Sequence, residues 1–156
     1  MHQVKQLILW RHADAEMPKA GQTDMERALT AKGFKQANQM AGWLKKNLPK
    51  YTLVVSSPAL RAVQTAEALT DGYDIEDSLQ PDTPFSHVLA YLNQAHAEQL
   101  LLVGHQPWIG DLIAHLLGAD SLNLSVKKGA IWWLRLSAES PQRYQLYTVQ
   151  TPQLID

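Results

Sequence analysis

The chain has 156 residues, 46% of them hydrophobic, with a formal net charge of −1 at pH 7 and no cysteine. This length is enough for one substantial hydrophobic core, so we expect a single domain over residues 1–156. The near-neutral charge gives no overall reason to bind nucleic acid or an anionic membrane, and the absence of cysteine excludes disulfides, thiolate metal sites and cysteine nucleophiles.

The first predicted element is a buried strand, because residues 7–10 form a continuous apolar run. Arg11 and His12 follow it directly. A loop rich in proline, glycine and polar residues comes next, and an amphipathic helix is then predicted over 30–48 with Phe34 on its apolar face. The first apolar run is too short for the core of a signal peptide and no later run could span a bilayer, so we expect a cytoplasmic protein.

The rest of the chain alternates strands with helices. The predicted elements are a strand at 52–55, a cap at Ser56 and Ser57, a helix at 58–69, a short strand near Ile75, a helix at 86–97, a strand at 100–103, a turn at Gly104 and a helix at 107–118. Two β-type runs at 130–137 and 143–151, joined by a Ser-Pro turn, predict a C-terminal hairpin. This order indicates an α/β fold of one domain in three layers, α/β/α, with a mostly parallel central sheet.

Chemically active side chains stand after three of the predicted strands. Arg11 and His12 follow the first, Arg61 lies one turn into the helix after the second, and His105 follows the strand at 100–103. Because the carboxyl ends of parallel strands meet at one edge of a sheet, we expect these four side chains to line one pocket. Guanidinium groups match phosphate oxygens in a bidentate way, so the pattern indicates a phosphoryl group as the ligand.

Most of the remaining aromatic and histidine side chains are expected to have structural roles. Trp10, Trp132 and Trp133 are expected in the core. Surface positions on polar helix faces are expected for His87 and His96. The exception is the tryptophan that directly follows GHQP, Trp108, which is expected at the mouth of the pocket.

Four stretches of the chain carry a family pattern, namely RHADAE, RALTAKGFKQA, VVSSPALRAVQTAE and LLLVGHQPWIGDL. Together, and in this order, they resemble the histidine phosphatase superfamily, also called the phosphoglycerate mutase-like family, over nearly the whole chain. The short chain and its RHADAE opening are most similar to the compact SixA-type phosphohistidine phosphatases. The family's Arg-His-Gly signature reads Arg11-His12-Ala13 here, so alanine replaces a glycine, the residue that tolerates strained turn angles.

The resemblance implies the phosphoglycerate mutase-like fold and a phosphatase that uses no metal and no cofactor. By position, His12 matches the nucleophile that forms a phosphohistidine intermediate. Arg11 and Arg61 match the arginines that hold the phosphate, and His105 matches the second histidine of the pocket. We expect His12 to be an exposed, neutral nucleophile and His105 to be protonated, so that it stabilises the phosphoryl group in transfer.

Relatives usually supply a glutamate general acid from the segment that reads SLQPDTPFSHVL here, where Asp82 and His87 are the candidates. Asp14 and Glu16 in the opening loop are further candidate acids. A serine or sugar alkoxide needs such an acid to leave, whereas imidazole, with a pKa of about 6.5, leaves phosphohistidine with far less help. The expected function is therefore removal of the phosphoryl group from phosphohistidine on a partner protein, such as a phosphotransfer domain.

Three other interpretations remain open. A phosphomonoesterase acting on a small phosphorylated metabolite would use the same pocket with Asp82 as the acid. A metal hydrolase would use residues with metal-ligand spacing, although two arginines would repel the cation; these residues are His12, Asp14, Glu16, Asp111 and His115. An inactive phosphate-binding or docking module is suggested by Ala13. In every case we expect a monomer with neither nucleic acid nor membrane as partner.

Overall fold

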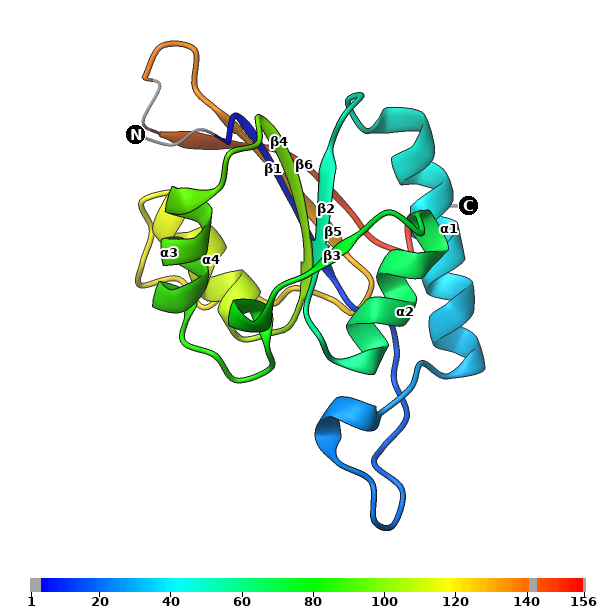
Figure 1. Ribbon diagram of the computed structural model, residues 1–156. Coiled ribbons are helices and arrows are strands. Elements are labelled where there is room, and N and C mark those ends of the chain that lie inside the picture. Colours follow the sequence, from blue (N-terminus) through cyan, green and yellow to red (C-terminus); the bar gives the residue numbers. More distant parts are fainter. Residues whose placement is uncertain (1–3, 141–142, 156) are drawn as a thin grey trace.

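Six strands form one sheet in the order β3-β2-β4-β1-β5-β6 in the computed structural model, which describes residues 4–140 and 143–155 (Figure 1). The strands are β1 Gln6–Arg11, β2 Leu53–Ser56, β3 Asp74–Ile75, β4 Gln99–Gly104, β5 Ile131–Leu136 and β6 Tyr144–Gln150. The helices are α1 Ala31–Asn47, α2 Leu60–Leu69, α3 Phe85–Gln94 and α4 Trp108–Leu116, with short 3-10 helices η1 Asp24–Glu26 and η2 Asp77–Leu79.

Four neighbouring strands of the sheet, β3, β2, β4 and β1, are parallel. The last two strands run antiparallel and form the expected hairpin at the edge. The proline of the expected Ser-Pro turn falls at 141–142, which lies outside the described residues. The sheet is therefore mostly parallel, as predicted.

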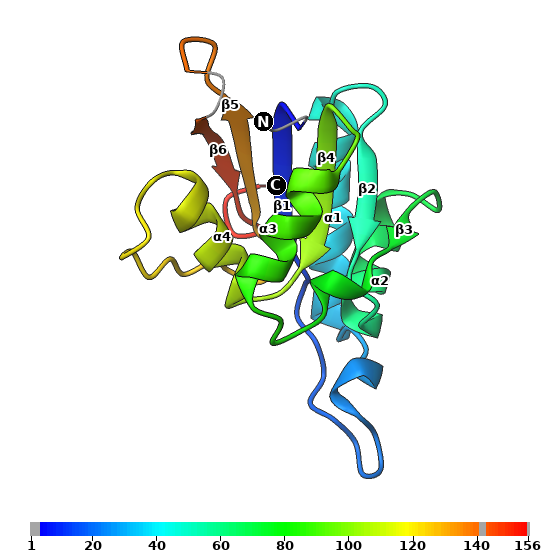
Figure 2. The ribbon, with the colours of Figure 1, turned by 60° about the vertical axis from the view of Figure 1, so that its left-hand side comes forward.

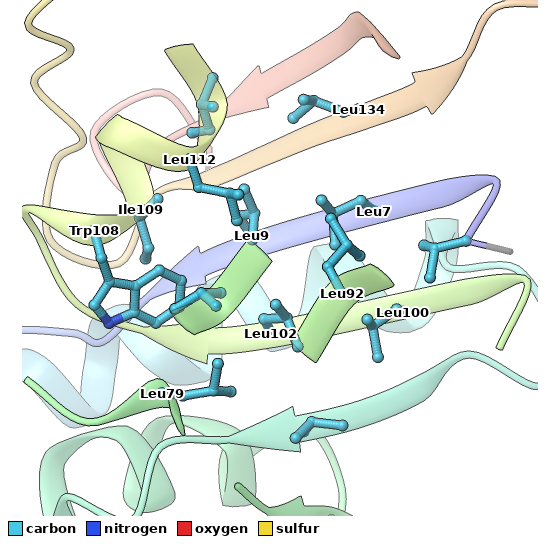
Figure 3. Close-up of a cluster of buried hydrophobic side chains, with 14 of the residues drawn as sticks. Leu7, Leu9, Leu79, Leu92, Leu100, Leu102, Trp108, Ile109, Leu112 and Leu134 are labelled. Carbon is cyan, nitrogen blue, oxygen red and sulfur yellow. The ribbon is translucent and has the colours of Figure 1, made fainter. Parts of the chain in front are cut away.

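Helices cover both faces of this sheet. Helices α1 and α2 lie on one face, and α3 and α4 lie on the other (Figure 1, Figure 2). Strand β1 is apolar on both sides, since Leu7 and Leu9 pack in the cluster that includes α3 and α4 (Figure 3) while Ile8 and Trp10 pack against α1 and α2. The three-layer α/β/α architecture is confirmed.

Two helix boundaries differ from the prediction. Helix α2 begins at Leu60, and its N-cap is Ala59 rather than a serine. The Ser57 hydroxyl instead accepts a hydrogen bond from the backbone N of Ala59 at 3.1 Å, which fixes the turn before the helix. Helix α3 ends at Gln94, before the expected end at Ala97.

Two aromatic side chains lie elsewhere than expected. Phe34 is 43% exposed instead of lying on the buried face of α1. Trp108 is fully buried in the core cluster rather than at the pocket mouth (Figure 3). A Cβ built on Gly104 would lie 2.0 Å from the Trp108 ring, so the glycine makes room for the tryptophan beneath the end of β4. No helix in the described part of the chain is both long and apolar enough to cross a membrane.

Candidate active site

The carboxyl ends of β1, β2 and β4 meet at one edge of the sheet. Arg11 at the end of β1 pairs with Gly104 at the end of β4, and Ser56 at the end of β2 pairs with Val103. The backbone N of His12 donates to the carbonyl of Gly104 at 3.1 Å, which holds the two strand ends together. The loop between β1 and α1 extends beyond this edge (Figure 2).

A cavity of about 230 Å³ opens at this edge and is called the phosphate pocket below. The four residues expected from the sequence all line it: Arg11, His12, Arg61 and His105. Loop residues complete the lining, namely Ala15, Asp24, Arg27, Pro81, Asp82, Gln106 and Lys128. Three arginines and a lysine outnumber the two carboxylates in this lining, so the pocket attracts an anion.

His12 is held as a neutral imidazole. Its side chain is buried, with 6% of the residue exposed, which corrects the expectation of an exposed histidine. Burial is the main cause that lowers the pKa of His12 to about 3, and the charges of Arg61 and Arg11 lower it further. The Ala13 carbonyl oxygen lies 2.7 Å from Nδ1 and acts in the opposite direction. Because a carbonyl only accepts, Nδ1 carries the proton and Nε2 keeps the lone pair.

Ala13 fits its position without glycine. The residues with positive φ in the described chain do not include Ala13, so the turn after β1 needs no glycine-like conformation. Its methyl group is buried in a small cluster with Leu29 and Ala37. Its backbone N donates to Thr65 Oγ1 at 3.1 Å, which ties the turn to helix α2.

Arg11 and Arg61, the two arginines expected in the pocket, are held by groups of the loops and of η1. Arg11 Nη1 donates to the carbonyl of Val126 at 2.8 Å. Arg61 donates from Nη1 to the carbonyl of Asp24 at 2.8 Å and from Nη2 to the Asp24 carboxylate at 3.0 Å. Burial and the charge of Arg61 lower the pKa of Arg11, so a bound anion would relieve the repulsion between these guanidinium groups.

Several polar nitrogen atoms around the pocket are buried without a partner among the described residues. They are Arg11 Nε, Arg61 Nε and His105 Nδ1. Buried polar groups are normally satisfied, so three unsatisfied ones around one cavity are typical of a site that binds a ligand.

His105 lies close to both Ser57 and His12. Its Nε2 lies 2.8 Å from the Ser57 hydroxyl, and its ring centroid is 5.2 Å from that of His12. Burial, then the neighbouring His12 and Arg61, lower the pKa of His105 to about 2. His105 is therefore neutral in the pocket without an anion, and its protonation during phosphoryl transfer stays a prediction. A bound phosphate dianion would raise its pKa.

Asp24 lines the pocket although the sequence patterns did not predict it as a site residue. Its carboxylate bonds Arg61 and also accepts from Arg27 Nη1 at 2.9 Å, so it joins two arginines of the lining. Although partial burial opposes the effect, the hydrogen bonds from Arg27 and Arg61 lower the pKa of Asp24. The i, i+3 spacing of Asp24 and Arg27 is visible in the sequence. The contact with Arg61, which spans 37 residues, has no local sequence signal.

Of the candidate general acids, only Asp82 lines the phosphate pocket. It is an exposed residue with a φ of 64°, in the left-handed region. Asp82 also lines a neighbouring hollow of about 660 Å³, and the second candidate from this segment, His87, lies in that hollow only.

The two candidate acids of the opening loop lie outside the pocket lining. The Asp14 carboxylate accepts from Thr30 Oγ1 at 2.7 Å and from Lys128 Nζ at 3.2 Å. The hydrogen bond from Thr30 is the main cause that lowers the pKa of Asp14, so this group is unsuited to donate a proton. The Glu16 carboxylate lies 3.8 Å from Lys19 Nζ at the surface.

The residues of the metal-hydrolase interpretation are dispersed. The Asp14 carboxylate accepts hydrogen bonds from a hydroxyl and a lysine. His115, in the last turn of α4, has its Nδ1 3.0 Å from the Asp120 carboxylate. Within residues 4–140 and 143–155, no group of three or more histidine, cysteine, aspartate or glutamate side chains is arranged to hold a metal ion.

Comparisons with known proteins agree with this geometry. Residues 7–83 match the family model described as histidine phosphatase superfamily (branch 1). Phosphohistidine phosphatase SixA of Escherichia coli strain K12 is 34% identical over 125 residues, which cover 74% of this chain and 76% of that protein. A SixA homolog of Haemophilus influenzae is 30% identical and covers 72% and 77% of the two chains.

The solved structures give the same result. The protein histidine phosphatase SixA complexed with tungstate superposes with a TM-score of 0.80 at 27% identity, and the match covers 95% of this chain and 97% of that one.

Proposed function

The chain belongs to the histidine phosphatase superfamily and is a phosphatase of this metal-independent family, and we propose that it removes the phosphoryl group from phosphohistidine on a partner protein. The observation that carries the proposal is the contact between His12 Nδ1 and the Ala13 carbonyl. It leaves Nε2 of a neutral, buried imidazole as the nucleophile at the strand edge. The names of the SixA relatives support the choice of phosphohistidine.

In this mechanism, Nε2 of His12 attacks phosphorus in line with the departing imidazole nitrogen. A bond forms between Nε2 and phosphorus while the bond to the substrate's imidazole breaks. Arg11 and Arg61 stabilise the charge on the equatorial oxygens, and His105 becomes a donor once the dianion raises its pKa. Water then attacks phosphorus, the bond from Nε2 to phosphorus breaks, and inorganic phosphate leaves the free imidazole of His12.

The exposed position of Asp82 supports imidazole as the leaving group. A serine or sugar alkoxide leaves well only with a positioned acid, whereas imidazole, with a pKa of about 6.5, leaves with less help. Asp82 is the one candidate acid in the pocket lining, and it lies at the surface rather than in a desolvated position. If Asp82 does protonate a leaving alkoxide, the second candidate function follows, a phosphomonoesterase acting on a small phosphorylated metabolite.

The remaining parts of the proposal concern the protein as a whole. We propose one histidine phosphatase domain over residues 1–156 that acts in the cytoplasm as a monomer without a cofactor, with neither nucleic acid nor membrane as partner. The coverage of 95% of this chain by the tungstate-bound relative supports a single domain. The inactive-module alternative loses its main argument, because Ala13 needs no positive φ.

Trapping of the intermediate tests the proposal. The protein is mixed with a partner protein that carries radiolabelled phosphohistidine, and acid-labile label on His12 is expected within one turnover. The His12→Ala variant should acquire no label, whereas His96→Ala, which removes an exposed histidine, should be labelled like the wild type. Faster steady-state turnover of sugar phosphates than of the phosphohistidine protein would select the phosphomonoesterase instead.

A further inference from the structure

A second hollow of about 290 Å³ adjoins the phosphate pocket and is called the lysine hollow. The two share Arg11 and Lys128 in their linings. The other residues that line the lysine hollow are Asp14, Lys32, Gln36, Ser125, Val126, Lys127 and Gln153. Four cationic side chains therefore face one carboxylate in this lining.

The segment that carries two of these lysines is anchored at the phosphate pocket. Before the lysines, the carbonyl of Val126 accepts from Arg11 Nη1 at 2.8 Å. After them, the backbone N of Gly129 donates to the carbonyls of Arg11 at 3.1 Å and His12 at 3.0 Å. Gly129 has a φ of 77°, so the turn suits glycine. Lys127 and Lys128 are thus held beside the catalytic strand end.

The positive charge of the lysine hollow is only partly balanced. The Asp14 carboxylate contacts Lys128 at 3.2 Å and accepts from Thr30. The hydrogen bond from Thr30 is the main cause that lowers the pKa of Asp14; burial opposes it, and Lys128 and the charge of Lys32 also lower this pKa. Among the ion pairs of the described residues, none involves Lys32 or Lys127.

We propose that Lys32, Lys127 and Lys128 form a second anion subsite, which binds a carboxylate or phosphate group of the substrate next to the phosphoryl group that is transferred. The inference deepens the proposed function, because it adds a second negative group to the substrate. Lysine ammonium groups bind such oxygens as point charges, and each exposed ion pair contributes about 0.2–1 kcal/mol. Two unpaired lysines should therefore strengthen binding of a matching substrate about twofold to thirtyfold.

The test uses inhibitors that need no turnover. Binding of phosphonoacetate, 3-phosphonopropionate and 4-phosphonobutyrate is measured by calorimetry, each against the alkylphosphonate of equal length without the carboxylate. At least one length should bind about twofold to thirtyfold more tightly than its partner, and salt near 0.5 M should remove most of the difference. Equal binding of all three pairs would overturn the subsite.

Matched lysine variants locate the effect. The Lys32→Gln/Lys127→Gln variant should lose the preference for the carboxylate but keep its affinity for alkylphosphonates. The control is Lys45→Gln/Lys46→Gln, which removes the same charge from the exposed last turn of α1 and should keep the preference. Loss of the preference in both variants would mean a general charge effect and would overturn the subsite.

A pair of phosphohistidine peptides then distinguishes the source of the second anion. The peptides differ only in two residues near the phosphohistidine, which are glutamates in one and glutamines in the other. A higher kcat/KM for the glutamate peptide, abolished in Lys32→Gln/Lys127→Gln, identifies acidic side chains of a protein partner. A preference confined to the small phosphonates identifies a small substrate instead. Absence of turnover on both peptides would reject the proposed function, while the calorimetry would still decide the subsite.

Discussion

The floor and the rim of the phosphate pocket are built differently. The floor consists of His12, Arg61 and His105, which are 2–6% exposed. The two histidines directly follow β1 and β4, and Arg61 lies in the first turn of α2. The rim includes Asp24 and Asp82, which are exposed residues of loops or short 3-10 turns. The floor sets protonation states through burial, whereas the rim contributes charges that solvent screens. The chemistry should therefore depend strongly on the floor and weakly on the rim.

Replacement of His12, the proposed nucleophile, should have the largest effect. We expect His12→Ala to lower kcat on phosphohistidine by roughly 10⁴ or more, because no other group can form the covalent intermediate. Thermal unfolding should show that the fold persists, since the main hydrophobic clusters do not include this side chain. Turnover in this variant within tenfold of the wild type would remove His12 as the nucleophile.

Loss of a guanidinium group from the floor should have the next largest effect. Arg61→Gln should lower kcat by about 10²–10³, because one aligned donor to the transferring oxygens is lost. Competitive inhibition by vanadate, which mimics the phosphoryl group in transfer, should weaken in parallel. Arg135→Gln, at an exposed strand position, is the matched control. Similar kinetics for both variants would place Arg61 outside the reaction.

The two floor histidines should give the protein a distinct pH dependence. Because His12 has a pKa of about 3 and His105 a pKa of about 2 in the folded chain, the unfolded state binds more protons below about pH 6.5. Stability should therefore fall as the pH drops from about 6.5, by at most about 1.4 kcal/mol per pH unit for each histidine. Denaturant unfolding across this range measures the slope.

The His12→Asn variant provides the comparison for this pH dependence and should have a shallower slope. The kcat/KM of the wild type should show no inflection near pH 6.5 that belongs to His12 in the free enzyme. An inflection near pH 6.5 that persists when each of the other histidines is replaced would contradict the prediction that His12 is neutral in the free enzyme.

Neutralising Asp82, the candidate general acid of the rim, should lower activity less. Asp82→Asn should lower kcat/KM on phosphohistidine by less than about tenfold, compared with the roughly 10²–10⁴ that general acid–base catalysis contributes when it is needed. The same assay on a sugar phosphate serves as the contrast, with Asp14→Asn and Glu16→Gln as parallel variants. A loss of kcat/KM above 10² on phosphohistidine would show that Asp82 acts as a general acid, with an effect as large as that of a floor residue.

The smallest effect is expected at Asp24, a positioning residue that acts through Arg61. Asp24→Asn should lower kcat/KM by about twofold to fivefold, because its exposed carboxylate pairs with Arg61 while the backbone carbonyl contact remains. Asp24→Glu should restore part of the loss, and high salt should make the variants converge on the wild type. A loss of activity as large as that of Arg61→Gln would show that Asp24 is required to hold the Arg61 guanidinium in place.

The sequence by itself determined the elements and the convergence of the site. The apolar runs at 7–10 and 100–103 predict strands covered on both faces, and the alternation with helices makes them parallel. The convergence of Arg11, His12 and His105 follows, because crossover connections bring the carboxyl ends to one edge. The four stretches that begin with RHADAE indicate the family, which the comparisons confirm.

Only the tertiary structure decided the protonation states and the loop contacts. Burial beside two arginines makes His105 neutral, and the room left by Gly104 places Trp108 in the core. The pairing of Asp24 with Arg61 and the place of Lys128 beside Asp14 join segments that are distant in the chain. Periodic patterns report the local backbone and its buried face, but loop conformation and desolvation depend on contacts across the whole fold, so no local pattern encodes them.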